Sequence, residues 1–260
     1  MSQFEYINTI NKVIEKIDSE EVASKIKEAA DLCAETIASG KLVHLFGSGH
    51  SILPVQDVFP RYGGYVGWHP LMDPRLMWHN VIGPNDAPGL LWLERQKGYI
   101  ANFLDSYDFK EGEVMIVYSH GGMNAAPIET ALYAKARGLK VIAVTSVDNY
   151  KNGAPATYEY EGRKVKLADI ADIVLDNCCS LVDAQVPLRN EPGYVGATST
   201  IGAIAVSQTL ATETALRLEQ KGIKVEPFVS PNVVGVDGAA RTKSNYKKYR
   251  KLVVEDLDNI

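Results

Sequence analysis

The chain has 260 residues, 46% of them hydrophobic and 23% charged, which is the balance of an ordinary soluble globular protein. A net charge of −5 and an isoelectric point near 5.6 argue against a nucleic-acid partner, because nucleic-acid-binding surfaces normally carry a basic patch. No apolar run is long enough to cross a bilayer and the three cysteines lack metal-ligand spacing, so we expect a cytoplasmic protein without a membrane partner.

The N-terminal region predicts two helices and a strand. Apolar positions recur at helical spacing over residues 3–17 and 21–39. The first of these segments lacks the apolar core of a signal peptide. The run LVHLF at 42–46 predicts a short buried strand. From it the tight sequence GSGHS at 47–51 leads into a helix that we expect to end at Arg61.

The next part of the chain is irregular. GYVGW at 64–68 predicts a second strand, and residues 69–97 are rich in Pro, Trp, His and Gly. Loops of this length in a compact domain are usually functional or disordered. Tryptophans such as Trp78 and Trp92 argue against disorder, so we expect a structured excursion near a site. Helical spacing resumes over 98–107.

The remaining elements complete an α/β pattern. Apolar runs at 114–119, 140–146 and 172–177 predict strands, and helices are predicted over 124–137 and 198–221. Continuous apolar strands separated by helices indicate a parallel sheet covered on both faces. We expect one doubly wound domain with helices before it and a helical extension after it. The basic cluster in that extension predicts a solvated helix.

Polar segments follow the predicted strands. They are GSGHS at 47–51, SHGGMN at 119–124, Thr145 with Ser146, and DNCCSLVDA at 176–184. Ligands of open α/β sheets bind beyond the carboxyl ends of the strands. The convergence of these segments therefore predicts a site for a small molecule.

The segment SHGGMN has the chemistry of an anion cradle. Gly121 and Gly122 permit backbone torsions that turn consecutive N–H groups inward. The helix that begins near Asn124 adds its positive end, and Ser119 adds a hydroxyl. The alternative is a plain strand-to-helix turn with Asn124 as its N-cap.

Neither glycine-bearing loop matches a nucleotide or hydrolase pattern. No GK[ST] sequence is present, and GSGHS lacks both the dinucleotide frame and the G-x-S-x-G frame that would activate Ser51. His44, His69 and His79 have no metal-ligand spacing with Asp or Cys. We predict no cofactor and no metal.

Two carboxylates and two histidines are candidates for acid–base chemistry. Glu213 lies on a helix that otherwise reads as buried, and its alternative role is an ion pair with Arg217. Asp57, on the helix after GSGHS, either faces the same cleft or is an ordinary surface residue. His50 and His120 lie in loops at strand ends, where a histidine titrates near neutrality and can move a proton on a sugar oxygen.

Several long motifs together resemble one family. LVHLFGSGHS, VMIVYSHGGMNAAPIETALYAKARGLKVIAVTS, DIVLDNCCSLVDA and TSTIGAIAVSQTLATETALRLEQKG are similar, in this order, to the sugar isomerase (SIS) domain superfamily. The resemblance covers residues 3–250 and is strongest to uncharacterised proteins related to phosphoheptose isomerase. It implies a three-layer αβα sandwich with a five-stranded parallel sheet. It also implies homodimers or homotetramers, in which neighbouring subunits complete the sites.

The resemblance also assigns roles to residues. It implies a catalytic carboxylate at Asp57 and an acid or base on the C-terminal helix, where this chain has Gln208 and Glu213. The substrate-binding residues that it implies are Gly47, Ser48, Gly49, His50, Ser51, Ser119, His120, Gly121, Gly122, Asn124, Thr145 and Ser146.

Two departures from the family pattern concern the anion. Gly121 replaces a serine of the family loop, and Met123 stands where close relatives often have a basic residue. Fewer charge-assisted bonds weaken phosphate binding. The ligand is then a phosphosugar held mainly by amides, an unphosphorylated sugar, or a sugar with another anion such as a sulfonate.

We therefore predict an isomerase that interconverts the aldose and ketose forms of an anionic sugar through an enediol. Glu213, or Asp57 in second place, would remove the proton next to the carbonyl, and His50 would assist ring opening and shuttle the hydroxyl proton. The alternatives are a non-catalytic sugar-sensing protein and a lyase that cleaves a sugar ether with the same acids.

Overall fold

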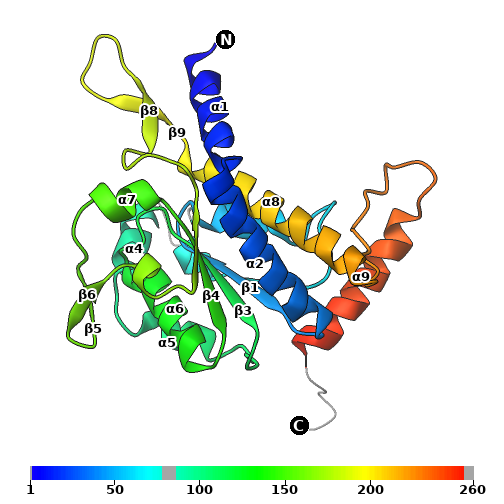
Figure 1. Ribbon diagram of the computed structural model, residues 1–260. Coiled ribbons are helices and arrows are strands. Elements are labelled where there is room, and N and C mark those ends of the chain that lie inside the picture. Colours follow the sequence, from blue (N-terminus) through cyan, green and yellow to red (C-terminus); the bar gives the residue numbers. More distant parts are fainter. Residues whose placement is uncertain (1, 78–85, 255–260) are drawn as a thin grey trace.

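A five-stranded, all-parallel sheet forms the centre of the computed structural model, which describes residues 2–77 and 86–254 (Figure 1). Its strand order is β2-β1-β3-β4-β7. The residues of β1 and β3 are all buried, as continuous apolar runs predict for a sheet covered on both faces. The strands are β1 (Val43–Gly47), β2 (Trp68–Leu71), β3 (Val114–Tyr118), β4 (Lys140–Thr145) and β7 (Ile173–Asp176).

Helices cover both faces of this sheet (Figure 1). The helices of the described residues are α1 (Glu5–Ile17), α2 (Glu20–Ala38), α3 (Ile52–Val58), α4 (Asp86–Leu93), α5 (Tyr99–Leu104), α6 (Ala125–Ala136), α7 (Val147–Asn152), α8 (Ser199–Gln220) and α9 (Gly238–Val253), of which α9 projects away from the sheet. Alternate strand residues enter different cores, because successive side chains of a strand point to opposite faces. Val43 and Leu45 pack with α2 and α8, whereas Phe46 packs with α5 and α6. The predicted three-layer αβα sandwich is confirmed.

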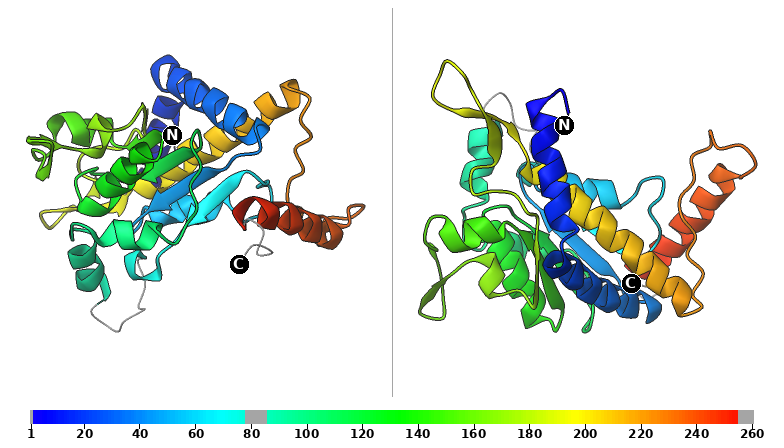
Figure 2. Two further views of the ribbon diagram at one scale, coloured as in Figure 1. Left: turned by 90° about the horizontal axis from the view of Figure 1, so that it is seen from below. Right: turned by 45° about the horizontal axis from the view of Figure 1, so that its top comes forward.

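Two antiparallel hairpins were not predicted. One joins β5 (Tyr158–Tyr160) to β6 (Arg163–Val165), and the other joins β8 (Ala184–Pro187) to β9 (Tyr194–Ala197). The second hairpin and α9 lie at opposite extremes of the molecule (Figure 1, Figure 2). Single-turn 3₁₀ helices occur at Pro74–Leu76 and Leu167–Asp169.

The second strand begins four residues later than predicted. The N–H of Gly63 donates to the carbonyl of Phe228 at 2.9 Å, and the N–H of Phe228 donates to the carbonyl of Gly64 at 2.8 Å. These bonds draw the segment out of the sheet toward the C-terminal region. Gly67 then turns the chain back with a φ of +139°, and a side chain there would clash with Ile37. The strand consequently spans Trp68–Leu71 rather than 64–68.

None of the helices within residues 2–77 and 86–254 has the length and apolar character needed to cross a membrane.

Candidate functional site

Loops from separate strands meet where the sheet ends. We call residues 47–51, 119–124, 145–146, 176–183 and 198–199 the carboxyl rim. The His120 carbonyl accepts hydrogen bonds from the Ser146 N–H and the Thr145 hydroxyl, both at 3.2 Å. The Ser199 hydroxyl lies 3.3 Å from Nε2 of His50. Residues 119–124 and 145–146 are therefore in contact, and residues 47–51 reach the segment 176–184 through Ser199, whose hydroxyl also bonds to Asp183.

His50 is connected to a carboxylate through a serine. Oδ2 of Asp183 accepts a hydrogen bond from the Ser199 hydroxyl at 2.8 Å, and that hydroxyl lies beside Nε2 of His50. Oδ1 of Asp183 accepts from the N–H groups of Thr198 and Ser199 at 2.9 and 2.7 Å. Burial acts to raise the pKa of Asp183, but these donors hold it below its ordinary value. Asp183 is therefore ionised near neutral pH.

This order of groups fixes the proton on His50. An ionised carboxylate only accepts hydrogen bonds, so the Ser199 hydroxyl must donate to Asp183. It can then bond to His50 only as an acceptor, which places a proton on Nε2 and leaves the Nδ1 lone pair free. A hydrolytic triad has the histidine between serine and acid. Here the serine lies between them, so Ser199 is not an activated nucleophile.

His120 is oriented by the side chain of Asn177. Oδ1 of Asn177 accepts from the Cys179 N–H at 3.0 Å, so its amide nitrogen faces Nδ1 of His120 at 3.3 Å. Nδ1 of His120 is then the acceptor and Nε2 carries the proton. This Nε2 atom is buried and makes no well-formed hydrogen bond among the described residues, although the backbone carbonyls of Leu181 and Ser180 lie near enough to act on the pKa of the ring. The proton of His120 is therefore fixed on Nε2.

The two histidines line one small cavity and are kept neutral. Burial lowers the pKa of both histidines, and the negative charge of Asp183 acts to raise each pKa without overcoming that effect. The cavity between them has a free volume of about 10 Å³, which is room for roughly one water molecule. A sugar does not fit inside it. A ligand of that size would lie above the cavity, against the open side of the rim.

The turn after β3 supplies free backbone donors. Gly122 has a φ of +60°, and its N–H donates to the Ser119 hydroxyl at 3.1 Å. A Cβ atom at this position would lie 3.3 Å from both Thr145 and Leu167, so the turn favours glycine. The N–H groups of Gly121 and Met123 have no acceptor within the described part of the chain. They provide the amides of an anion cradle.

Asn124 stands at the N-cap position of α6 but makes no capping hydrogen bond. Its amide instead donates to Oε1 of Glu94 at 2.7 Å. Of the two alternatives left by the sequence, the side-chain cap is therefore absent, and the Ala126 N–H in the first turn of α6 donates to the Glu94 carbonyl instead, at 2.9 Å.

Glu94 is a carboxylate that contacts the rim and that the sequence did not single out. It follows α4 and is only 6% exposed. The Ser48 hydroxyl donates to its Oε2 at 2.9 Å, so Glu94 joins the loop after β1 to the turn after β3 through Asn124. Burial raises its pKa, against the opposing effects of the Ser48 hydrogen bond and the charge of Arg95. Its place at the end of the apolar run GLLWL was the only available sequence signal.

The remaining predicted binding residues mostly shape the rim. Ser146 donates to the Cys179 carbonyl at 2.6 Å, and its hydroxyl accepts from the Asn149 N–H at 3.0 Å. The Gly49 N–H donates to the Leu76 carbonyl at 2.8 Å. A side chain at Gly47 would collide with the Ser51 carbonyl at 2.1 Å. These residues, with Thr145, hold the loops in place.

Glu213 lies far from the rim of its own chain. It is fourteen residues beyond Ser199 on α8, which is about 21 Å along a helix axis. Its carboxylate pairs with Arg217 at 2.7 Å and borders a hollow between α8 and the first two helices. The ion pair that the sequence offered as the alternative is formed.

Asp57 is also engaged away from the rim. Its Oδ2 accepts from the Gln208 amide at 2.7 Å, and its Oδ1 pairs with Arg61. Gln208 is nine residues beyond Ser199, about 13 Å along α8. The structure thus brings together the two histidines and the two glycine-bearing loops, but places neither predicted carboxylate beside them.

Aromatic residues of the irregular segment divide into two groups. Trp78 and His79 lie outside the described residues. Trp68 and His69 are buried on β2, so they pack in the core rather than present a face to a ligand. Within residues 2–77 and 86–254, no three His, Cys, Asp or Glu side chains are grouped to hold a metal ion.

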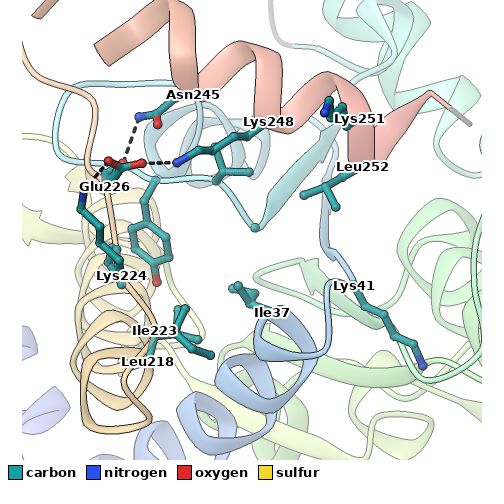
Figure 3. Close-up of a pocket in the computed structure, with 14 residues that line it drawn as sticks. Ile37, Lys41, Leu218, Ile223, Lys224, Glu226, Asn245, Lys248, Lys251 and Leu252 are labelled. Carbon is teal, nitrogen blue, oxygen red and sulfur yellow. Dashed lines mark hydrogen bonds and ion pairs between the residues drawn. The ribbon is translucent and has the colours of Figure 1, made fainter.

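A larger hollow lies beneath α9 (Figure 3). Ile37, Leu218 and Ile223 form an apolar floor, and lysines surround it. Glu226 is the carboxylate on its lining, and it is paired with Lys224 and Lys248. The lining contains no histidine. Paired charges over an apolar floor do not offer acid–base chemistry, so the rim is the better candidate for an active site.

Comparisons with known proteins agree with this architecture. Residues 5–146 match the family model described as the SIS domain. A UPF0309 protein of Thermoanaerobacter pseudethanolicus is 32% identical over 96% of this chain and 98% of its own length. Another, from Caldanaerobacter subterraneus, is 34% identical over 89% of this chain and 92% of its own length.

Solved structures share the fold at low sequence identity. Phosphoheptose isomerase from Neisseria gonorrhoeae superposes with a TM-score of 0.52 at 17% identity, over 81% of this chain and 92% of that one. The enzyme from Francisella tularensis gives 0.52 at 15% identity, over 82% and 98%. The family-model match and the full-length relatives carry the assignment. The chain belongs to the SIS domain family.

Proposed function

We propose that this protein is an isomerase that interconverts the aldose and ketose forms of an anionic sugar at the carboxyl rim. The observation that carries the proposal is the placement of His50 and His120 on one cavity, with the proton of each ring positioned by its contact with Ser199 or Asn177. An enediol intermediate needs hydrogen-bond donors at the oxygens where charge develops. The names of the structural neighbours, phosphoheptose isomerases, point in the same direction.

The anion would be held by the turn after β3. The N–H groups of Gly121 and Met123, which have no acceptor among the described residues, are donors without a formal charge. No arginine or lysine belongs to this turn. A phosphate, or a sulfonate of similar shape, would be bound mainly by amides.

The two histidines would handle the oxygens. His120 would donate to the carbonyl oxygen, as a neutral imidazole does when burial keeps it uncharged. His50 has its free Nδ1 lone pair available to take the hydroxyl proton and return it to the other oxygen. Groups of this kind each contribute on the order of 10²–10⁴-fold to the rate.

We further propose a cytoplasmic homodimer or homotetramer. The cavity between the histidines holds roughly one water, so the rest of a sugar needs walls that one chain does not supply in its described part. A neighbouring subunit would provide them. Asp57 and Glu213, the carboxylates predicted from the sequence, then remain candidates to test because a partner's copy is not confined to its own rim.

The test uses aldose phosphates and ketose phosphates of five to seven carbons, with sulfonate analogues, in deuterated water. Nuclear magnetic resonance should show interconversion and deuterium entering at the carbon next to the carbonyl. His120→Gln should lower this exchange by about 10²-fold or more. Asp57→Asn and Glu213→Gln report on the two sequence-derived bases.

Other outcomes of the same experiment select the alternatives. A sugar phosphate that raises the melting temperature without any exchange indicates a sensor. Loss of an ether substituent from the sugar indicates a lyase. Either result contradicts the isomerase.

A further inference from the structure

Glu94 is a buried carboxylate held between two loops that belong to different strands. Its Oε2 accepts from the Ser48 hydroxyl at 2.9 Å and its Oε1 accepts from the Asn124 amide at 2.7 Å. The Glu94 carbonyl also accepts from the Ala126 N–H at 2.9 Å, which ties its backbone to the first turn of α6. The position of this carboxylate is therefore fixed from three directions.

The hydrogen bonds of Glu94 leave it chemically available. Each carboxylate oxygen can accept more than one hydrogen bond, and each here accepts one from a side chain. The adjacent cation, Arg95, is directed elsewhere: its Nη1 donates to the Leu91 carbonyl oxygen at 2.5 Å. Glu94 thus has no ion-pair partner among the described residues, in contrast to Asp57 and Glu213.

Burial without a directly paired cation makes a carboxylate more basic, and here it outweighs the opposing effects of the Ser48 hydrogen bond and the charge of Arg95 on the pKa. Removing a charge from water disfavours the ionised form and raises the pKa of Glu94. A base whose pKa moves toward neutrality is better matched to removing a proton from carbon. The alternative is a purely structural role, in which Glu94 only holds the two loops together.

We propose that Glu94 is the general base that takes the proton from the carbon next to the sugar carbonyl. This inference rests on the proposed isomerase function. The C–H bond breaks and its proton moves to a Glu94 oxygen. The electron pair becomes the carbon–carbon double bond of the enediol. The hydroxyl proton passes between the two oxygens through His50, and Glu94 returns its proton to the other carbon. No oxidant, reductant or other reactant is consumed.

Glu94→Gln is the decisive variant, because it can keep the hydrogen bonds between the two loops while it removes the carboxylate that would accept the proton. The Gln carbonyl can accept from the Asn124 amide, and its own amide can donate to the Ser48 hydroxyl. We expect kcat to fall by about 10³-fold or more, with KM within about threefold of the wild type and an unchanged melting temperature. The substrate is the panel sugar that the wild type turns over fastest.

Glu129→Gln is the matched control. Glu129 lies on α6 and accepts hydrogen bonds from the Gly98 N–H at 3.0 Å and the Tyr158 hydroxyl at 2.8 Å. Its hydrogen bonds within the described part of the chain do not reach the rim, so the kcat of Glu129→Gln should equal that of the wild type.

The outcomes separate this inference from the proposed function. Wild-type exchange that persists in Glu94→Gln overturns the role of Glu94 and leaves the isomerase standing. No exchange in the wild type overturns both. A Glu94→Gln protein that fails to fold is replaced by Glu94→Asp, which keeps the charge but withdraws it by one methylene. A lowered kcat with unchanged melting then supports the base, and an unchanged kcat overturns it.

Discussion

The two ends of the central sheet use the same residue types for different purposes. The carboxyl rim holds His50 and His120, and Glu94 is hydrogen-bonded to two of its loops through Ser48 and Asn124. At the other end lies what we call the amino-end cluster, formed by His44, His69, Glu113, Tyr107 and Phe109. There Nε2 of His44 is 2.8 Å from Oε2 of Glu113, and both side chains are almost fully buried. Both ends thus hold histidines and a buried carboxylate.

The difference lies in what surrounds these groups. Glu113 also accepts from the backbone N–H groups of Leu42 and Lys110 at 3.1 and 2.8 Å. The ring of His44 meets Phe109 with centroids 4.8 Å apart, and aromatic rings close the cluster. The carboxylate of Glu94 accepts only from the side chains of Ser48 and Asn124, and Asn124 follows the turn whose Gly121 and Met123 N–H groups have no acceptor among the described residues. The amino-end cluster, with backbone donors and aromatic rings around its carboxylate, has the features of a structural site. The carboxyl rim, with donors that have no acceptor among the described residues, has the features of a reactive site.

Removing the carboxylate at the amino end should give the largest effect. Glu113→Ala leaves His44 and two backbone N–H groups buried without their acceptor. We expect a loss of about 3–5 kcal/mol in the free energy of unfolding. Urea unfolding measures it, and the turnover of the protein that remains folded should be unchanged. A loss below about 1 kcal/mol would remove the distinction between the two ends.

The second prediction concerns the folding stability that the protein loses at acid pH because of His69. Burial, with a smaller contribution from neighbouring His44, lowers the pKa of His69 to about 4, while Glu113 acts in the opposite direction. The unfolded chain therefore binds this proton first as the pH falls from about 6.5, and folding stability drops until about pH 4. The total is about 3 kcal/mol, at up to 1.4 kcal/mol per pH unit. His69→Phe should remove this part of the slope in urea unfolding between pH 7 and 4.5. An identical slope in both proteins contradicts it.

The third prediction concerns the carboxyl rim, where Asp183 and Ser199 position the proton of His50. Asp183→Asn should lower kcat by about 10–100-fold, or about 1.4–2.7 kcal/mol, because Ser199 no longer has to donate to it and the proton on His50 is no longer fixed. Asp183 is a positioning residue, so the readout is the ¹⁵N chemical shift of His50, which reports its tautomer. Ser199→Ala should produce the same spectral change. A single unaltered Nε2–H tautomer in both variants would argue against the relay.

Most of the fold followed from local sequence patterns. The buried strands are continuous apolar runs, and the long helices repeat apolar residues at helical spacing, so both are visible without tertiary information. The short hairpins are largely exposed and carry little such pattern. The shift of β2 depends on the pairing of Gly63 and Gly64 with Phe228, more than 160 residues away. No local window contains that information.

The location of the site could be predicted from the sequence, but its carboxylate residues could not. Glycine-bearing loops after strands identified the rim because strand ends of a parallel sheet converge. Glu213 attracted attention as a charge within an apolar helix, yet its partner Arg217 neutralises it one turn away. Glu94 and Asp183 gave weaker signals, because their importance comes from contacts with Asn124 and Ser199, which only folding creates.

Helix α6 begins without a side-chain cap, because the amide of Asn124 is turned to Glu94. The main-chain carbonyl of the same Glu94 accepts from the Ala126 N–H at 2.9 Å, and Pro127 has no N–H to satisfy, so Glu94 supplies the acceptor that a cap would supply. One residue therefore closes the start of this helix with its backbone and reaches the loops after β1 and β3 with its side chain. A displacement of Glu94 would open the end of α6 and release both loops at the same time.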